Sequence, residues 1–208
     1  MEIVTLFPTL IYQSKLKRSG SLNLRLIKEI TELSKQDKLG RQWSKENYPG
    51  GYTSYASLSD LPYRSPTFAQ FSEALEPHAN QFAKSQGWDT RGRQLRMTSC
   101  WINIMPKGTY HTLHLHPHSV ISGTYYVSTP PSSVSLKLED PRMAFYMNAP
   151  VRSLRKNPSG DLYYHVKPVA GSFVMFESWL RHEVPPNQSL KPRISLSFNY
   201  DLEGAEDE

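Results

Sequence analysis

Residues 93–105, RQLRMTSCWINIM, begin a region rich in β-branched and aromatic residues that extends almost to the end of the chain. Five further segments of this kind follow, at residues 119–128, 133–140, 161–168, 171–178 and 193–202, and clusters of Gly, Pro, Asn and Ser separate them. Such segments favour β-strands, and such clusters favour turns. Six short strands with no long helix between them predict an antiparallel sandwich or barrel.

The first 90 residues carry two helical patterns. Apolar residues recur at helical spacing over residues 21–38, with Ser21 as the expected cap and Gly40 as the expected stop. A second helix is predicted to begin at Ser65-Pro66 and to end near Gly87, with a kink or interruption at Pro77. The Gly-, Ser- and Tyr-rich stretch between the helices, residues 41–64, is expected to be irregular but ordered. The expected fold is therefore α+β and mainly β, with two helices supporting the β core.

Length and composition bound the organisation of the chain. Its 208 residues are 38% hydrophobic, which suits one domain over residues 1–208, with a helical elaboration at 1–90 and the β core at 91–202. No apolar run approaches the roughly 20 residues of a membrane helix, and the single Cys100 excludes an internal disulfide framework. The start, MEIVTLFPTLIYQS, is typical of a folded first strand rather than of a signal peptide. We therefore expect a cytoplasmic protein, either a monomer or a homodimer.

The net charge of +5 does not by itself indicate a nucleic-acid partner. A basic protein can attract acidic substrates or nucleic acid. Here the Lys and Arg residues are scattered and form no continuous stripe, so nucleic-acid binding is not expected.

Four of the seven histidines lie within eight residues of HTLHLHPHS, residues 111–119. Residues two apart on a strand point to the same face, so His114 and His116 can reach one metal ion if the strand ends at Pro117. Such a cluster can also be mere polar surface. A third histidine, His182, follows a later predicted strand. Two histidines from one strand and one from its neighbour form a three-ligand set with open positions, as in catalytic rather than structural metal sites.

At this point the residues resemble the non-heme Fe(II), 2-oxoglutarate-dependent oxygenases, whose core is a double-stranded β-helix of the jelly-roll or cupin type. Their signature has a His-x-Asp/Glu pair, a distal His, and an Arg or Lys about ten residues later. Here Arg193 follows His182 by eleven residues. The resemblance implies Fe(II) on His114, His116 and His182. It also implies that 2-oxoglutarate is bound by Arg193 and Ser195, with Asn103 and Tyr126 as further co-substrate residues.

A narrower group of bacterial and phage oxygenases shares more blocks with this chain, including FPTLIY, GGYTS, the HPHS segment and FESWLRHEVPPN. One departure from the wider family is His116, which stands where that family has a carboxylate. We interpret His116 as a replacement ligand. A carboxylate from Glu139 or Asp140 is the alternative, although neither has the family's spacing.

The expected function is Fe(II)- and 2-oxoglutarate-dependent hydroxylation of a small molecule or a peptide, with release of succinate and CO2. The alternatives are a three-His cupin-type dioxygenase that does not use 2-oxoglutarate and a non-catalytic metal-binding β-sandwich. Substrate selection is expected from the loops at 40–64 and 139–162. Tyr125 and Tyr126 are adjacent and must face opposite sides of their strand, and strand parity alone does not say which one faces the pocket.

Overall fold

The computed structural model describes residues 1–148, 150 and 161–204. Within these ranges the chain forms three α-helices, two 3₁₀ turns and ten strands. In chain order these elements are β1 (Ile11–Lys15), α1 (Ser19–Gln36), α2 (Lys38–Asn47), β2 (Tyr52–Thr53), η1 (Leu61–Tyr63), α3 (Pro66–Ser85), β3 (Gln94–Met105), β4 (His111–His114), β5 (Ile121–Ser128), β6 (Leu136–Glu139), η2 (Met143–Phe145), β7 (Tyr163–Val166), β8 (Ser172–Glu177), β9 (His182–Val184) and β10 (Arg193–Glu203). Among the described helices none is both long enough and apolar enough to cross a membrane.

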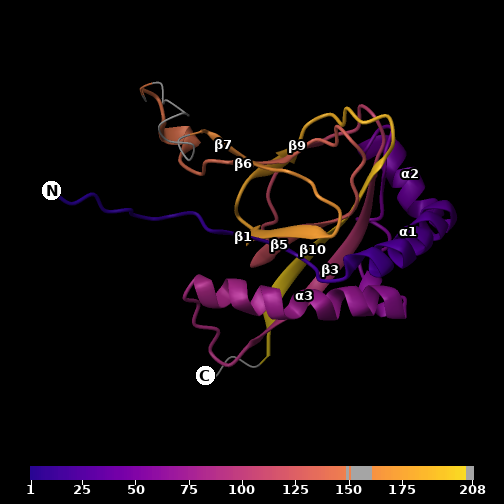
Figure 1. The fold of residues 1–208 in the computed structure, drawn as a ribbon, viewed down its shortest axis with the longest axis horizontal. Coiled ribbons are helices and arrows are strands. Elements are labelled where there is room, and N and C mark those ends of the chain that lie inside the picture. Colours follow the sequence, from indigo (N-terminus) through magenta and orange to yellow (C-terminus); the bar gives the residue numbers. More distant parts are fainter. Residues whose placement is uncertain (149, 151–160, 205–208) are drawn as a thin grey trace.

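The strands form two antiparallel sheets. The larger sheet has the order β1-β8-β5-β10-β3-β2, and the smaller one has the order β4-β9-β6-β7. The smaller sheet lies above the larger one in Figure 1, and α3 runs along the opposite side of the larger sheet. Two strands of the larger sheet, β1 and β2, come from the first 90 residues, so this N-terminal part contributes to the sheet as well as to the helices.

The central strand β10 separates two environments. Ile194, Leu196, Phe198 and Tyr200 belong to the core cluster that packs against α1 and α3. The residues between them, at positions 193, 195, 197 and 199, line a cavity on the other side of the sheet. Because side chains alternate along a strand, one strand supplies both the apolar core and the wall of the cavity.

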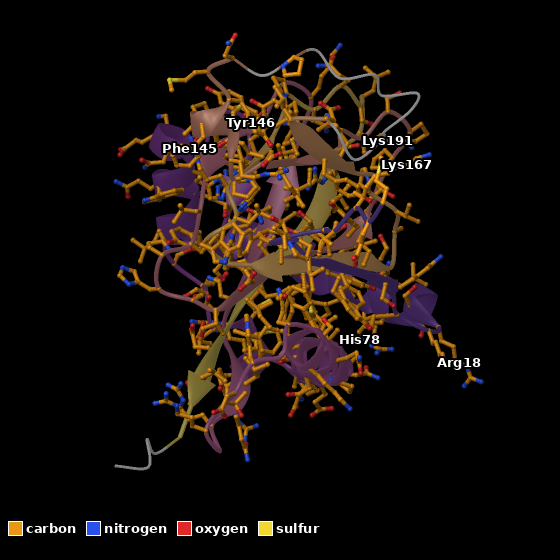
Figure 2. The ribbon with its side chains drawn as sticks, turned by 90° about the vertical axis from the view of Figure 1, so that its left-hand side faces the viewer. Arg18, His78, Phe145, Tyr146, Lys167 and Lys191 are labelled. Atoms are coloured by element: carbon orange, nitrogen blue, oxygen red, sulfur yellow. The ribbon has the colours of Figure 1, made fainter. Side chains whose placement is uncertain are left out.

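The predicted strands and the two predicted helices are confirmed, but Ser21 is not the cap of the first helix, because α1 already begins at Ser19. All six β segments contain a strand, and the antiparallel mainly-β architecture is the expected one. Helix α3 begins as expected, since the Ser65 side chain accepts a hydrogen bond from the Phe68 amide and Pro66 is the first helical residue. The isolated His78 on α3 is structural, because its Nδ1 is hydrogen-bonded to the Tyr12 hydroxyl at 2.8 Å. Figure 2 shows His78 on the helix layer, distant from Phe145 and Tyr146.

The expectation of only two helices was wrong, because α2 occupies part of the stretch expected to be irregular. Its cap is Asp37, whose carboxylate accepts a hydrogen bond from the Gly40 amide at 2.8 Å and another from the Tyr52 hydroxyl at 2.8 Å. Gly40, the expected stop, lies inside α2. A Cβ there would come within 2.0 Å of the Asp37 carboxylate, so the glycine is needed for this cap.

Pro77 does not interrupt α3, which continues to Ser85. An interior proline costs a helix about 3 kcal/mol. Phe71, Leu75 and Phe82 on the two sides of Pro77 are almost completely buried in the core cluster, and each such side chain contributes roughly 1.5–3 kcal/mol on burial. Packing against the sheet therefore outweighs the loss of one helical hydrogen bond.

The Gly123→Ala variant should lower the stability of the fold. A Cβ at Gly123 would lie 2.5 Å from the Phe198 ring and 2.5 Å from the Val174 carbonyl oxygen. Overpacking of this kind costs about 1–3 kcal/mol, which corresponds to a fall of roughly 2–12 °C in the melting temperature of a chain of this size. The matched control is Gly20→Ala on α1, where a Cβ meets nothing within 4 Å. Equal melting temperatures for the two variants would contradict the prediction.

Candidate metal centre

Three histidines converge between β4, β9 and the segment that follows β4. His114 is the last residue of β4 and pairs directly with His182, the first residue of β9. His116 lies beyond the end of β4, and its backbone N–H donates to the Ser178 carbonyl at 2.9 Å. One candidate ligand atom from each of the three side chains lies within 4.8 Å of the other two. The ring centroids of His114 and His182 are 4.3 Å apart. A metal ion can therefore be held between them.

The hydrogen bonds of two of the rings determine which nitrogen faces the metal position. Nδ1 of His114 lies 2.6 Å from the Thr112 carbonyl oxygen, and Nδ1 of His182 lies 2.9 Å from the Leu180 carbonyl oxygen. A carbonyl oxygen only accepts, so each Nδ1 carries the proton and donates it. The lone pair is then on Nε2, which is the usual arrangement for a metal-binding histidine.

Burial keeps two of the rings neutral at physiological pH. Burial, with a smaller contribution from neighbouring His114, lowers the pKa of His182 to about 3 and the pKa of His116 to about 4. A neutral imidazole is the form that binds a metal ion. These two rings therefore need not lose a proton before they coordinate.

No carboxylate joins the three histidines among the described residues. The buried Glu139 pairs with Arg181 at 2.9 Å, and Asp140 pairs with Arg142 at 2.8 Å. The Arg142 guanidinium holds the pKa of Asp140 down at about 2. Both acids that could have completed the site are thus engaged elsewhere, which supports His116 as the third ligand.

Arg193 is buried at the start of β10 without an acidic partner. Its side chain is 2% exposed, and no described Asp or Glu forms an ion pair with it. Nη1 donates to the Val134 carbonyl oxygen at 3.2 Å, whereas Nε has no hydrogen-bond partner. Burial lowers the pKa of Arg193. Since an unpaired buried charge costs several kcal/mol, this arrangement strongly favours an anionic ligand.

Two tyrosines lie close to Arg193. The guanidinium carbon of Arg193 is 5.1 Å from the centre of the Tyr126 ring. The charge of Arg193 also lowers the pKa of Tyr48 and of Tyr126, against a larger rise that burial causes. Neither buried hydroxyl has a hydrogen-bond partner in the described part of the chain. Tyr126 was a predicted site residue, whereas Tyr48 was missed because it follows α2 in the stretch expected to be irregular.

The parity of β5 places Tyr126 rather than Tyr125 on the side of the cavity. The Tyr125 hydroxyl donates to Asn23 on α1, so this side chain belongs to the helix-facing core. Tyr126 packs in the cluster between the two sheets. It is fully buried under Arg193 and does not itself line the cavity.

Asn103 and Ser195 lie side by side on β3 and β10. Ser195 pairs with Asn103 on one side and with Tyr126 on β5 on the other. The Asn103 amide donates to the Ser197 hydroxyl at 3.0 Å, and its Oδ1 has no described partner. The co-substrate residues predicted from the sequence are therefore neighbours on the inner face of the larger sheet.

A cavity of about 360 Å³ joins the histidine cluster to Arg193. Asn103, His111, His114, His116, His182, Arg193 and Ser195 all line it. His111 stacks on Tyr48 with the ring centroids 4.4 Å apart. One compartment thus contains three imidazoles that could hold a metal ion and, among its described residues, one cation without an acidic partner.

Comparison with known proteins relates this arrangement to a family. Residues 99–199 match the family model described as "Putative 2OG-Fe(II) oxygenase". No curated protein matches the chain. The fold is similar to that of a Pseudomonas putida prolyl-4-hydroxylase, with a TM-score of 0.61, 16% identity and coverage of 94% of both chains.

Two further solved structures are similar in fold. HygX from Streptomyces hygroscopicus, determined with nickel and 2-oxoglutarate bound, gives a TM-score of 0.60 at 15% identity and covers 93% of this chain and 83% of HygX. A prolyl hydroxylase from Trichoplax adhaerens, in complex with a peptide fragment of hypoxia inducible factor, gives a TM-score of 0.62 at 13% identity. The match covers 92% of this chain and 83% of the hydroxylase. At these identities the likeness establishes the double-stranded β-helix fold.

His114→Ala and His182→Ala should each abolish Fe(II) binding, because two imidazoles do not retain a labile ferrous ion. Iron content after anaerobic loading and desalting measures this. The matched control is His165→Ala, an exposed histidine on β7 outside the cavity, which should retain one iron per chain. Stoichiometric iron in either cavity variant would contradict the ligand assignment.

His116→Asp should keep both the metal and the fold, because aspartate is smaller and supplies the carboxylate that the wider family uses at this position. Iron content and the far-ultraviolet circular dichroism spectrum test the two expectations separately. An intact spectrum with complete loss of iron would show that His116 has another role.

Proposed function

We propose that this chain, which over residues 99–199 belongs to the 2OG-Fe(II) oxygenase family, is an oxygenase that uses Fe(II) and 2-oxoglutarate. The observation that carries the proposal is the cavity that joins three imidazoles to a buried Arg193 with no acidic partner among the described residues. A metal site alone would fit many proteins. A metal site with an anion-binding arginine at the other end of the same cavity fits a chelating dicarboxylate.

His114, His116 and His182 would hold the iron. When bound, iron and 2-oxoglutarate together supply the oxidising chemistry of this enzyme class, which hydroxylates a C–H bond and releases succinate and CO2. The hydrogen bonds at Nδ1 of His114 and His182 orient both rings before the metal arrives. A set of three imidazoles would hold the metal without enclosing it, so the site would stay open to the co-substrate.

Arg193 would bind the distal carboxylate of 2-oxoglutarate through the edge of the guanidinium that carries the unpaired Nε–H. An arginine suits this role because its planar fork matches a carboxylate with two parallel hydrogen bonds. The Ser195 hydroxyl lies two residues further on the same face of β10. The unpaired hydroxyls of Tyr48 and Tyr126 remain protonated, because burial raises the pKa of both, and they can donate to the same anion.

Charge balance supports a dianionic co-substrate. Fe(II) on three neutral imidazoles, together with Arg193, brings three positive charges into a largely buried site that has no described carboxylate. A ligand with two negative charges removes most of this excess. A three-His dioxygenase that does not use 2-oxoglutarate would have no use for the cation, and a non-catalytic binding module would never release succinate.

The substrate is expected to be a small molecule or a peptide. Relatives by fold include enzymes whose structures were solved with hygromycin B and with a protein fragment. We also propose a cytoplasmic location, because ferrous iron and the free thiol of Cys100 both fit a reducing compartment.

Replacing Arg193 should weaken 2-oxoglutarate without affecting iron. Loss of a buried bidentate partner costs about 2–5 kcal/mol, which is on the order of 30- to 5000-fold in affinity. Arg193→Ala and Arg193→Met should both show this loss, and Arg193→Lys should recover part of it, since it restores the charge without the fork. Anaerobic titration of the Fe(II) proteins, followed through the visible charge-transfer band, measures the affinity. Unchanged affinity in Arg193→Ala would favour the three-His dioxygenase or the binding module.

The same variants separate function from folding. Arg193→Met fills the space of the arginine and removes an unpaired buried charge, so without ligand its melting temperature should equal or exceed that of the wild type. Saturating 2-oxoglutarate should raise the melting temperature of the Fe(II)-loaded wild type and leave that of the variant unchanged. A large loss of stability in ligand-free Arg193→Met would indicate a structural role for Arg193.

A further inference from the structure

On the inner face of the larger sheet, the row of side chains that β10 contributes from Arg193 to Asn199 is entirely polar, which is unusual for a central strand that faces another sheet. On β10 the inward positions are occupied by Arg193, Ser195, Ser197 and Asn199, and all four line the cavity. Six residues of strand span about 20 Å. The row therefore extends well beyond the Arg193 end, which the proposed function assigns to the co-substrate.

The outer part of this row forms a neutral hydrogen-bonding floor with β5. Ser197 and Asn199 pair in register with Thr124 and Ser122. The Ser122 hydroxyl donates to Asn199 Oδ1 at 2.8 Å, and the hydroxyls of Thr124 and Ser197 are 3.3 Å apart. Every member of this floor is a hydroxyl or an amide, so each can both donate and accept.

An aromatic wall stands beside the floor and leads to the histidines. Trp101 pairs in register with Ser197, so both side chains lie on the inner face of the sheet. The Trp101 ring is 5.7 Å from His116 and 5.2 Å from Tyr55, and Tyr55 is 6.3 Å from Trp43. Trp101 is buried, whereas Tyr55 is 52% exposed. The wall thus runs from the metal position to the surface.

The cavity offers no ionic partner to a substrate. None of the described residues that line it is Asp, Glu or Lys, and Arg193 is its only permanent charge. A charged group of the substrate would lose its hydration in this cavity without gaining a counter-ion, which costs several kcal/mol. The volume of about 360 Å³ is near the lower end for ligand sites and also has to accommodate the co-substrate. Only a small, neutral part of the substrate can enter.

We infer that the outer half of the cavity binds a neutral, polyhydroxylated ring, such as a sugar or cyclitol unit of the substrate. The C–H face of such a ring packs on Trp101 and Tyr55, since the faces of aromatic side chains are large and apolar. Its hydroxyls match the mixed donors and acceptors of the floor formed by Ser122, Thr124, Ser197 and Asn199. The catalytic meaning of this subsite rests on the proposed function, because a ring bound there lies beside His116.

The test measures binding without turnover. The protein is loaded with Zn(II), which is diamagnetic and does not activate oxygen, and is saturated with 2-oxoglutarate. Saturation-transfer NMR then compares methyl α-glucopyranoside, methyl β-galactopyranoside and myo-inositol with the cation glucosamine, the anion glucuronate, N-acetylprolinamide and thymidine. At least one neutral hydroxylated ring should bind, and should do so about tenfold or more tightly than the charged sugars.

Variants locate the binding. Tyr55→Ala and Asn199→Ala should each lower the affinity for the neutral ring about tenfold. The matched control is Tyr164→Ala on β7, since Tyr164 is also 52% exposed but lies outside the cavity. Its affinity should equal that of the wild type. Thermal unfolding of each variant confirms that it is folded.

Any of three results would overturn the inference. The first is that no neutral ring binds at concentrations up to roughly tens of millimolar, and the second is that a charged sugar, the prolinamide or thymidine binds most tightly. The third is that the Tyr55 and Tyr164 variants lower the affinity equally. A calorimetric titration of 2-oxoglutarate on the same sample separates the two proposals. Co-substrate binding without ring binding overturns only the subsite. Absence of co-substrate binding overturns the proposed function.

Discussion

The main physical constraint on this protein is the buried guanidinium of Arg193, which has no acidic partner among the described residues. Such a charge lowers the stability of the ligand-free protein, and a hydrophobic residue of the same volume would cost less. The fold nevertheless places two tyrosines with unpaired hydroxyls, Tyr48 and Tyr126, near Arg193 rather than a carboxylate. An internal Asp or Glu would neutralise Arg193 and close the site to a dicarboxylate. The lost stability would therefore be the physical basis of the proposed affinity for an anion.

The strand that carries Arg193 also builds the core, so site and stability are coupled through β10. Its apolar side chains pack on the helices while its polar ones line the cavity. Pairing with β3 on one side and with β5 on the other holds the register from both edges. A slip of one residue would turn Arg193 and Ser195 into the helical core and Phe198 into the cavity. Because both faces would then be wrong at once, the packing of the helices protects the position of the site residues.

The histidine cluster shows how much of a site a local pattern can predict. The H-x-H spacing and the later His182 correctly indicated three converging imidazoles. Strand parity alone does not explain the position of His116, because β4 ends at His114. A hydrogen bond from the His116 backbone N–H to the Ser178 carbonyl holds His116 in place. Tyr48 was not predicted, since its role depends on the position of α2 against the sheet. Residues 41–64 show no periodic pattern that would predict the packing of α2 against the sheet.

The sequence by itself determined the strand-rich core, the cap of α3 and the spacing from His182 to Arg193. It also determined that His114 and His116 lie in one segment and His182 in a later one. These features depend on side-chain type and on spacing along the chain, which local backbone preferences translate directly into structure. The tertiary structure alone decided that Tyr126 rather than Tyr125 lies under Arg193, that Glu139 and Asp140 pair with arginines, and that α2 is helical. Each of these outcomes depends on contacts between residues distant in the chain. Such contacts follow from the pairing of the strands and the packing of the helices, which no single segment encodes.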